Sequence, residues 1–340
     1  MATRIDHYSI ALVDNLETDI DEVNFSDNLR IVRLDLITEP RAVQLLGEET
    51  FKVAKQIQAE GPLKQGGYRL ALYRPSMMTH QIINRVAELS NHALEWLFAG
   101  EVDDPFNENY DRDMPMKFFS DVITSLRLLK AGLVGRFTAI HIIDGDPAGL
   151  DGPWSKGETL FYQPSLMNMH NRYVLPKDDV ENLKKMFSVV SGCKNQQILI
   201  ALTRFNRQYA REDDIDRLID IVVGFESLYL KDATTEFRLA TRAATHLGKD
   251  PNQRERIYNC LSSAYRLRNG IVHGTTRELR NHKILRKRGW NSPYAMLEEL
   301  STLLREAIQS ILSDVGEKKF SSNFHKKLDN AIIMGEGFLV

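Results

Sequence analysis

Hydrophobic residues recur every three or four positions along the second half of the chain, from about residue 178 to the end. This spacing is typical of helices that pack one face on a core. Start signals separate the helices: Asp250, Pro251 and Gln253 offer an N-cap, a first-turn proline and a third-position glutamine, and Ser292 with Pro293 offers a simpler version. The pattern predicts helices over residues 178–190, 196–211, 215–230, 236–247, 254–273, 293–315 and 323–333.

The first half of the chain has a mixed pattern. Residues 29–37 and 136–143 have the β-branched residues and partial alternation of strands. Residues 78–98 and 117–130 have helical spacing, and residues 144–156 are crowded with Gly, Pro and Asp, which predicts a loop. We therefore expect a mainly α protein, with a mixed α/β domain (residues 1–190) before an all-helical domain (residues 191–340). The helix over residues 178–190 fits either domain.

Composition narrows the class of protein. A chain of 340 residues is long for one core, and 43% hydrophobic with 26% charged residues is typical of a folded soluble protein. The net charge of -2 excludes a globally basic nucleic-acid binder, so any nucleic-acid site must be a local basic patch. Cys193 and Cys260 are too few for a disulfide framework or a cysteine-based zinc site. No signal peptide or membrane-length apolar run is visible, so we expect a cytoplasmic protein with no membrane partner.

Two of the predicted helices place a charge where the hydrophobic pattern calls for an apolar residue. Arg268 follows Leu261 and Ala264 on one helix, and Glu226 lies next to Phe225 on another. An unpaired buried charge is very unfavourable, so the two charges either neutralise each other or face a wet cleft. The alternative is that both lie at helix edges with their charges in water.

His273 follows Arg268 by five residues, which on one helix separates the two side chains by about 140°. Asn269 shares a face with His273. Two copies of the helix meeting across a two-fold axis would bring Arg268 and His273 to one phosphate, and Gly270 would permit such a close approach. A simple helix-end signal is the other interpretation of Gly270.

The chain from Ala201 to Gly274 resembles the Apea-like branch of the HEPN superfamily. The matching segments are ALTRF, DRLIDIVVGFESLYL, RLATRAATHLG and YRLRNGIVHG, and a looser resemblance covers residues 117–134. The family signature is Arg, usually followed by Asn, His or Asp, and then His after four to six intervening residues. Arg268, Asn269 and His273 satisfy it.

The resemblance implies a metal-independent endoribonuclease that works as a homodimer without a cofactor, in which the 2′-hydroxyl of RNA attacks the adjacent phosphate. Arg268 would hold the phosphate, His273 would transfer protons and Asn269 would orient the pair, with Glu226 as a supporting contact. These residue types suit the reaction, because histidine exchanges protons near neutral pH and arginine stays charged. The position where some family toxins have a modified tyrosine is Thr275 here, which argues against the same control.

The biological setting that the resemblance implies is a toxin or an anti-phage defence effector. The N-terminal domain would then sense a trigger or bind an antitoxin partner. The alternative is a non-catalytic HEPN module that binds RNA or nucleotide and mediates dimerisation. A third option, that the N-terminal half holds the main activity, has no catalytic constellation to support it.

A basic run follows the candidate site. It could hold the RNA backbone, with Trp290 and Tyr294 stacking on bases. The alternative is a solvated loop whose aromatic residues anchor the next helix. The basic residues are Arg277, Arg280, Lys283, Arg286, Lys287 and Arg288.

Overall fold

The computed structural model describes residues 6–14, 16–26, 29–33, 69–73, 113–132, 134–144, 154–158, 173–211, 213–230, 235–275, 279, 283–336 and 338. The described residues are mainly helical, with a smaller sheet, as the sequence predicts. The chain divides into two compact units, and two of the divisions fall inside the helices α4 (Asp113–Leu129) and α5 (Val180–Gly192). Most of the helices lie in the second unit, which contains residues 124–131, 164–168 and 185–340.

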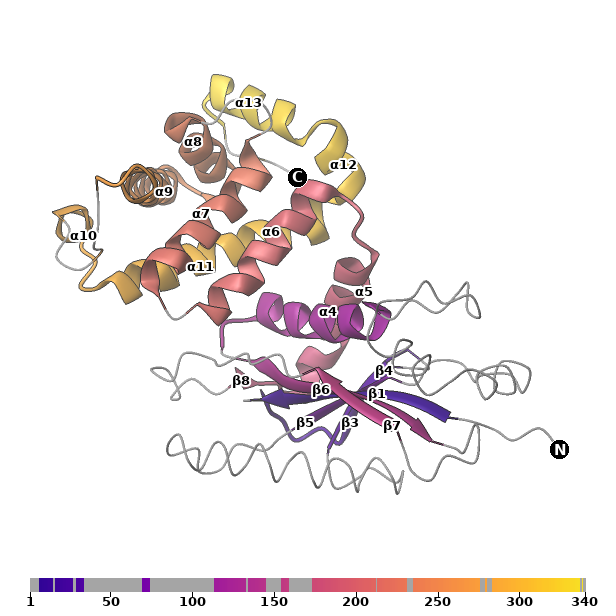
Figure 1. The fold of residues 1–340 in the computed structure, drawn as a ribbon. Helices are drawn as coiled ribbons and strands as arrows, with labels where there is room; N and C mark the ends of the chain where they lie inside the picture. Colours follow the sequence, from indigo (N-terminus) through magenta and orange to yellow (C-terminus); the bar gives the residue numbers. More distant parts are fainter. Residues whose placement is uncertain are drawn as a thin grey trace, which may run out of the picture. The chain divides into compact units, whose positions relative to one another are not determined.

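The helices of the second unit follow the predicted ranges closely (Figure 1). They are α6 (Gln196–Arg207), α7 (Asp214–Tyr229), α8 (Glu236–Leu247), α9 (Pro251–Val272), α11 (Pro293–Ser310) and α13 (Phe324–Met334). A π-helical turn, Ile311–Val315, continues α11 to the predicted end. Two short helices that the pattern does not predict, α10 (Lys283–Lys287) and α12 (Glu317–Ser322), are too brief to show a period.

Side-chain caps fix where these helices begin. Asp250 accepts from the backbone N–H of Gln253, and the Gln253 side chain accepts from the N–H of Lys249, so the predicted cap of α9 forms. Ser292 caps α11 in the same way, through the N–H of Ala295. Each cap satisfies backbone donors that a helix leaves without partners in its first turn.

Helix α7 lies at the centre of the helical unit and packs against α6, α8, α9 and α11. Phe225 and Tyr229 of α7 are fully buried in the core. Gly224 permits the close approach of α11, because a Cβ at this position would lie 2.9 Å from a methyl of Leu304. Because α7 packs against α9, the side chains of α7 that face α9 are held at fixed positions relative to it. These positions define the candidate site described below.

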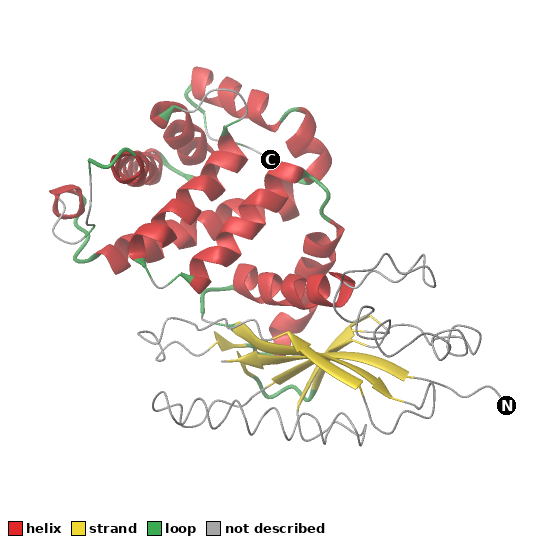
Figure 2. Ribbon diagram, in the orientation of Figure 1, coloured by secondary structure: helices red, strands yellow, loops and turns green. Residues whose placement is uncertain are grey.

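The first unit contains an antiparallel sheet, drawn as one twisted layer in Figure 2. Its strand order is β3-β4-β5-β1-β6-β7, and a short parallel pair joins β2 (Leu16–Glu17) to β8 (Tyr173–Val174). The strands of the large sheet are β1 (Asp6–Asp14), β3 (Glu22–Ser26), β4 (Leu29–Arg33), β5 (Arg69–Tyr73), β6 (Gly135–Asp144) and β7 (Trp154–Glu158). Strand β1 pairs with two strands that are far from it in sequence, as in the pairing of Ser9 with both Tyr73 and His141.

The predictions for the first half have mixed outcomes. The helix over residues 117–130 and the strand over residues 136–143 are confirmed as α4 and β6, and the first part of residues 29–37 is confirmed as β4. The loop over residues 144–156 is wrong at its end, because Trp154 begins β7 and pairs with Ile143. The predicted helix over residues 78–98 and residues 34–37 lie outside the described residues.

Within the described residues, no helix is both long enough and apolar enough to cross a membrane.

Candidate functional site

Arg268 of α9 and Glu226 of α7 form an ion pair, with 3.0 Å between Nη2 and Oε2. Their side chains are 22% and 14% exposed, so the pair is largely withdrawn from water but open at one side. Of the alternatives that the hydrophobic pattern left open, mutual neutralisation is therefore the one that the structure contains. The core position beside Glu226 is filled by Phe225, which is fully buried.

Burial raises the pKa of the Glu226 carboxyl, and the attraction of Arg268 opposes that shift without cancelling it. The cause is that the charged carboxylate loses hydration inside the protein.

Two hydrogen bonds hold the guanidinium of Arg268 in place. Nη1 donates to Oδ1 of Asn269 over 2.9 Å, Nη2 donates to Glu226, and Nε is enclosed with no acceptor. An arginine carries two hydrogens on each Nη atom, so each Nη retains an N–H after these contacts. Arg268 is thus fixed in place while keeping donors that a phosphate could accept from.

His273 caps the C-terminal end of α9 and is exposed to solvent. Gly274 follows it with φ +73°, and the N–H groups of Gly274 and Thr275 bond to the carbonyls of Ile271 and Gly270, at 3.0 Å and 2.7 Å. This is the Schellman arrangement that ends many helices. The helix-end signal is therefore Gly274, and the interpretation of Gly270 as that signal is wrong.

Thr275 contributes to the same cap through its side chain, since its Oγ1 donates to the Gly270 carbonyl over 3.0 Å. The helix end that presents His273 is thus fixed by backbone and side-chain bonds together.

Within one chain, Arg268 and His273 leave α9 in different directions. Arg268 turns toward α7, whereas His273 lies one and a half turns later, about 140° around the helix. Asn269 connects them, because it bonds to Arg268 and shares a helix face with His273 to within about 40°. The site therefore presents a fixed cation and a solvent-accessible imidazole from one helix end.

The basic run after α9 has two parts with different surroundings. Lys283, Arg286 and Lys287 are exposed, whereas Nε of Arg288 donates to Oγ of Ser263 on α9 over 2.8 Å. Arg277 and Arg280 lie outside the described residues. The exposed members remain candidates for contacting a phosphate backbone, and Arg288 has a structural contact.

The two aromatic residues after this run also differ. Trp290 is buried and donates through Nε1 to Glu299 over 2.7 Å, so it anchors the segment to α11 and is not available for stacking on a base. Tyr294 is 37% exposed, on the first turn of α11. The anchor interpretation is therefore correct for Trp290.

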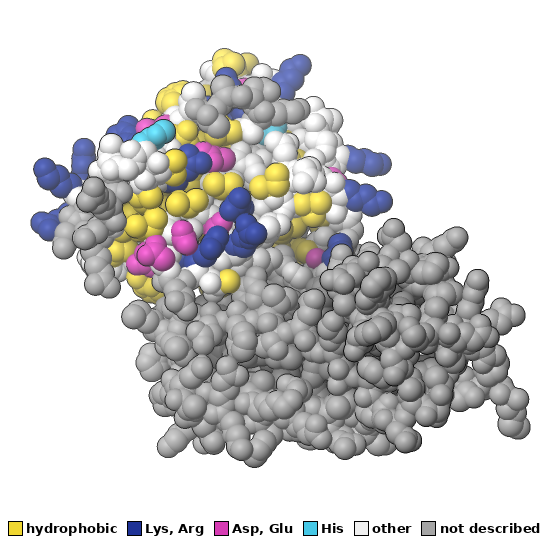
Figure 3. All heavy atoms as spheres, viewed as in Figure 1, with side chains coloured by type: hydrophobic (Ala, Val, Ile, Leu, Met, Phe, Trp, Pro, Cys, Tyr) yellow, Lys and Arg dark blue, Asp and Glu magenta, His cyan; other side chains and the backbone are white. Residues whose placement is uncertain are grey.

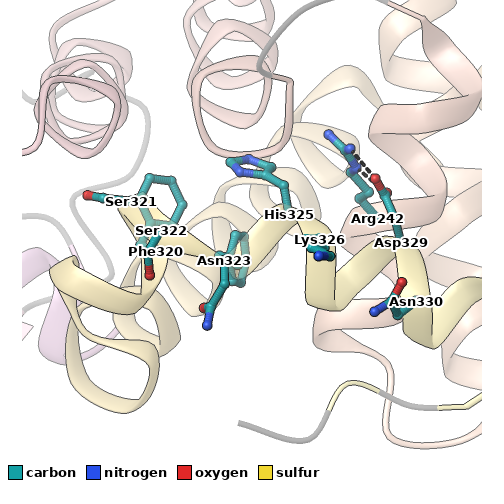
Figure 4. A pocket seen from close by; sticks show the side chains of 10 residues that line it. Arg242, Phe320, Ser321, Ser322, Asn323, His325, Lys326, Asp329 and Asn330 are labelled. Carbon is teal, nitrogen blue, oxygen red and sulfur yellow. Dashed lines mark hydrogen bonds and ion pairs between the residues drawn. The ribbon is translucent and has the colours of Figure 1, made fainter.

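The face drawn in Figure 3 carries Lys and Arg side chains mainly at its edges, with hydrophobic and acidic side chains between them. A hollow of about 290 Å³ lies elsewhere on the helical unit, at α12 and α13 (Figure 4). In it, Arg242 and Asp329 bind each other through two contacts of 2.8 Å and 2.7 Å. His325 bonds through Nε2 to the Leu228 carbonyl.

The sequence pattern did not single out this hollow. Arg242 and Asp329 come from helices that are far apart in the chain, and nothing local in the sequence predicts their pairing. The described residues contain no group of three His, Cys, Asp or Glu side chains placed as a metal site would require.

Comparison with protein-family models, with curated proteins and with solved structures finds no match for this chain.

Proposed function

We propose that this chain is a HEPN-type endoribonuclease that cleaves RNA by attack of the 2′-hydroxyl on the adjacent phosphate, without a metal ion or cofactor. The observation that carries the proposal is the fixed Arg268, bonded to Glu226 and Asn269, five residues before an exposed His273 at a rigid helix end. The family resemblance of the segment from Ala201 to Gly274 supplies the roles. The unit that contains these residues would be the HEPN helical domain, and the first half an accessory or sensor domain.

In the proposed reaction, the 2′-oxygen forms a bond to phosphorus, and the bond from phosphorus to the 5′-oxygen of the next nucleotide breaks. The products are a 2′,3′-cyclic phosphate and a 5′-hydroxyl. The remaining N–H groups of Arg268 stabilise the charge on the phosphate oxygens. His273 accepts the proton of the 2′-hydroxyl or donates one to the leaving oxygen, as a general base or acid.

The different directions of Arg268 and His273 support a homodimer. In a two-fold pair, Arg268 of one copy and the imidazole of the other would face the same phosphate. That imidazole would accept the proton of the 2′-hydroxyl, and its protonated form could return a proton to the leaving oxygen. The partners are therefore RNA and a second copy of the chain, with a trigger or antitoxin acting through the first half. A cytoplasmic toxin or anti-phage effector is the setting that fits these partners.

The second candidate function is a non-catalytic HEPN module that binds RNA or nucleotide and dimerises. The two contacts of Arg268, with Glu226 and Asn269, also fit this candidate, because they hold Arg268 in place without any ligand. In this case Arg268 would mainly join α9 to α7.

Variants of the two central residues distinguish the candidates. His273 is exposed, so His273→Ala should keep the melting temperature while losing RNA cleavage by at least about a hundredfold, the usual worth of general acid–base catalysis. Arg268→Lys keeps the charge and tests the phosphate contact, with a melting curve to detect loss of the Glu226 pair. Cleavage that survives both changes in folded protein would reject the catalytic proposal.

A further inference from the structure

A second basic surface lies on α12 and α13, separate in sequence from the run at residues 283–288. Between Glu317 and Met334 the chain has four lysines and two carboxylates. All four lysines are exposed, and within the described part of the chain none forms an ion pair. They are Lys318, Lys319, Lys326 and Lys327.

The two carboxylates of this segment do not neutralise the lysines. Asp329 is bound by Arg242, and Glu317 accepts the backbone N–H of Lys194 over 3.0 Å. Lys194 is itself exposed. In Figure 3, Lys and Arg side chains project from the edge of the molecule beside α12 and α13. The surface is therefore positive in a chain whose net charge is -2.

The hollow of about 290 Å³ is lined by one of these lysines, Lys326, and its volume is close to the lower limit for small-molecule sites. Lys326 lines it together with Asn323 and Asn330, which extend away from Arg242 in Figure 4. Amide side chains can both donate to and accept from a nucleobase or a sugar hydroxyl. The surface thus combines lysine charges, which would bind the phosphates of an RNA backbone, with uncharged amide groups, which can bind a base or a sugar. Binding to a lipid headgroup layer would not require the amide groups.

The surface and the proposed catalytic site share helix α7. His325 of α13 bonds to the carbonyl of Leu228, and Leu228 follows Glu226 by two residues, about 3 Å along the α7 axis and about 200° around it. The surface and the Glu226–Arg268 pair therefore lie on different faces of α7.

We propose that the α12–α13 surface, with Lys318, Lys319, Lys326 and Lys327, binds the phosphate backbone of single-stranded RNA. This inference rests on the proposed function for its ligand. It places an RNA-binding surface in a part of the chain that lies beyond the segment from Ala201 to Gly274.

The test measures binding of a labelled 12-nucleotide RNA to the full chain carrying His273→Ala, which prevents cleavage, over a range of salt concentrations. Changing the four lysines to Gln should weaken binding at least about tenfold. It should also reduce the slope of log affinity against log salt by about 0.7 for each lysine that contacts a phosphate. Circular dichroism and a melting curve establish that the variant is folded.

A matched pair of variants separates a specific surface from net charge. Lys326→Gln with Lys327→Gln should reduce the salt slope, whereas Lys185→Gln with Lys249→Gln removes the same charge from two other exposed lysines and should not. Equal effects of the two pairs, or an unchanged slope in the four-lysine variant, would overturn the inference. Retained RNA binding together with lost binding to phosphatidylserine vesicles would overturn it in favour of a membrane.

The outcome is separable from that of the proposed function. A chain that binds RNA through these lysines but never cleaves it would support the RNA-binding surface and reject the endoribonuclease. Cleavage of RNA at unchanged affinity after the lysines are removed would support the endoribonuclease and reject the RNA-binding surface.

Discussion

Oε2 of Glu226 lies 3.0 Å from Nη2 of Arg268, yet the pKa of that carboxyl is raised because burial outweighs the attraction of the arginine. The pair therefore joins α7 to α9 with a carboxylate that is partly desolvated. Removing Arg268 and removing Glu226 should therefore change the free energy of unfolding by different amounts.

Arg268→Met should destabilise the protein more at pH 8 than at pH 5. Without Arg268 the partly buried carboxylate has no cation, and at acidic pH it can take up a proton and lose its charge. The expected loss at pH 8 is about 1–3 kcal/mol, measured by urea unfolding at both pH values. Adding Glu226→Gln should remove the pH dependence of this loss. An equal loss at both pH values in Arg268→Met would contradict the prediction.

Gly274→Ala should destabilise the end of α9 by about 1–2 kcal/mol. At φ +73° an L side chain is strained, although the space around a Cβ is open. Gly192→Ala is the control, because its surroundings are equally open and its φ is not in the left-handed region, so it should cause no loss. Thermal unfolding of both variants measures the difference. Equal melting temperatures for the two variants would show that the end of α9 tolerates a side chain at position 274.

His246 should make the helical unit sensitive to acid. Burial lowers the pKa of His246 to about 4, and its ring nitrogens bond to the Tyr229 hydroxyl at 2.7 Å and the Ser310 hydroxyl at 3.1 Å. Below pH 6.5 the unfolded chain binds a proton that the folded chain does not. Stability should therefore fall from pH 6.5 to about pH 4, by up to about 3 kcal/mol from this residue.

The measurement for His246 is urea unfolding across this pH range, with His246→Gln as the comparison. The Gln variant keeps hydrogen-bonding groups but does not titrate, so its stability should change less as the pH falls. Parallel pH profiles for the two proteins would show that other groups cause the acid sensitivity.

Arg286→Ala with Lys287→Ala should weaken RNA binding and reduce its salt dependence without changing the melting temperature, because both side chains are exposed. Arg288→Ala should instead lower the stability by about 1 kcal/mol, since its bond to Ser263 is lost. Binding titrations and melting curves on both variants separate these roles. A stable Arg288→Ala protein with reduced RNA binding would place Arg288 on the ligand.

The helices of the second half were predictable because each has a hydrophobic stripe and several begin at a side-chain N-cap, as Asp250 and Ser292 show. The pairing of Arg268 with Glu226 was one of the alternatives that the sequence left open, because two interrupted stripes left two opposite charges to be neutralised or hydrated. A local pattern indicates which face of a helix is buried. It does not indicate which other helix covers that face.

What the sequence did not predict depends on contacts between distant segments. Asp220 is 1% exposed and is held by Arg204 and Arg211, but its neighbours Leu218 and Val222 give no sign of a buried charge. The burial of Trp290 depends in the same way on Glu299 of α11. The strand at Trp154 was hidden because glycine and proline surround it and its partner is β6.

The central claim is cleavage by the 2′-hydroxyl through His273 and Arg268. Its most direct test identifies the ends that purified protein leaves on one defined RNA in EDTA, beside the same RNA with a single 2′-deoxy nucleotide at the cut site. The account predicts cleavage in EDTA, 2′,3′-cyclic phosphate or 3′-phosphate ends with 5′-hydroxyls, and resistance of the deoxy substrate. Cleavage that stops in EDTA, or that leaves 3′-hydroxyl ends, would contradict it.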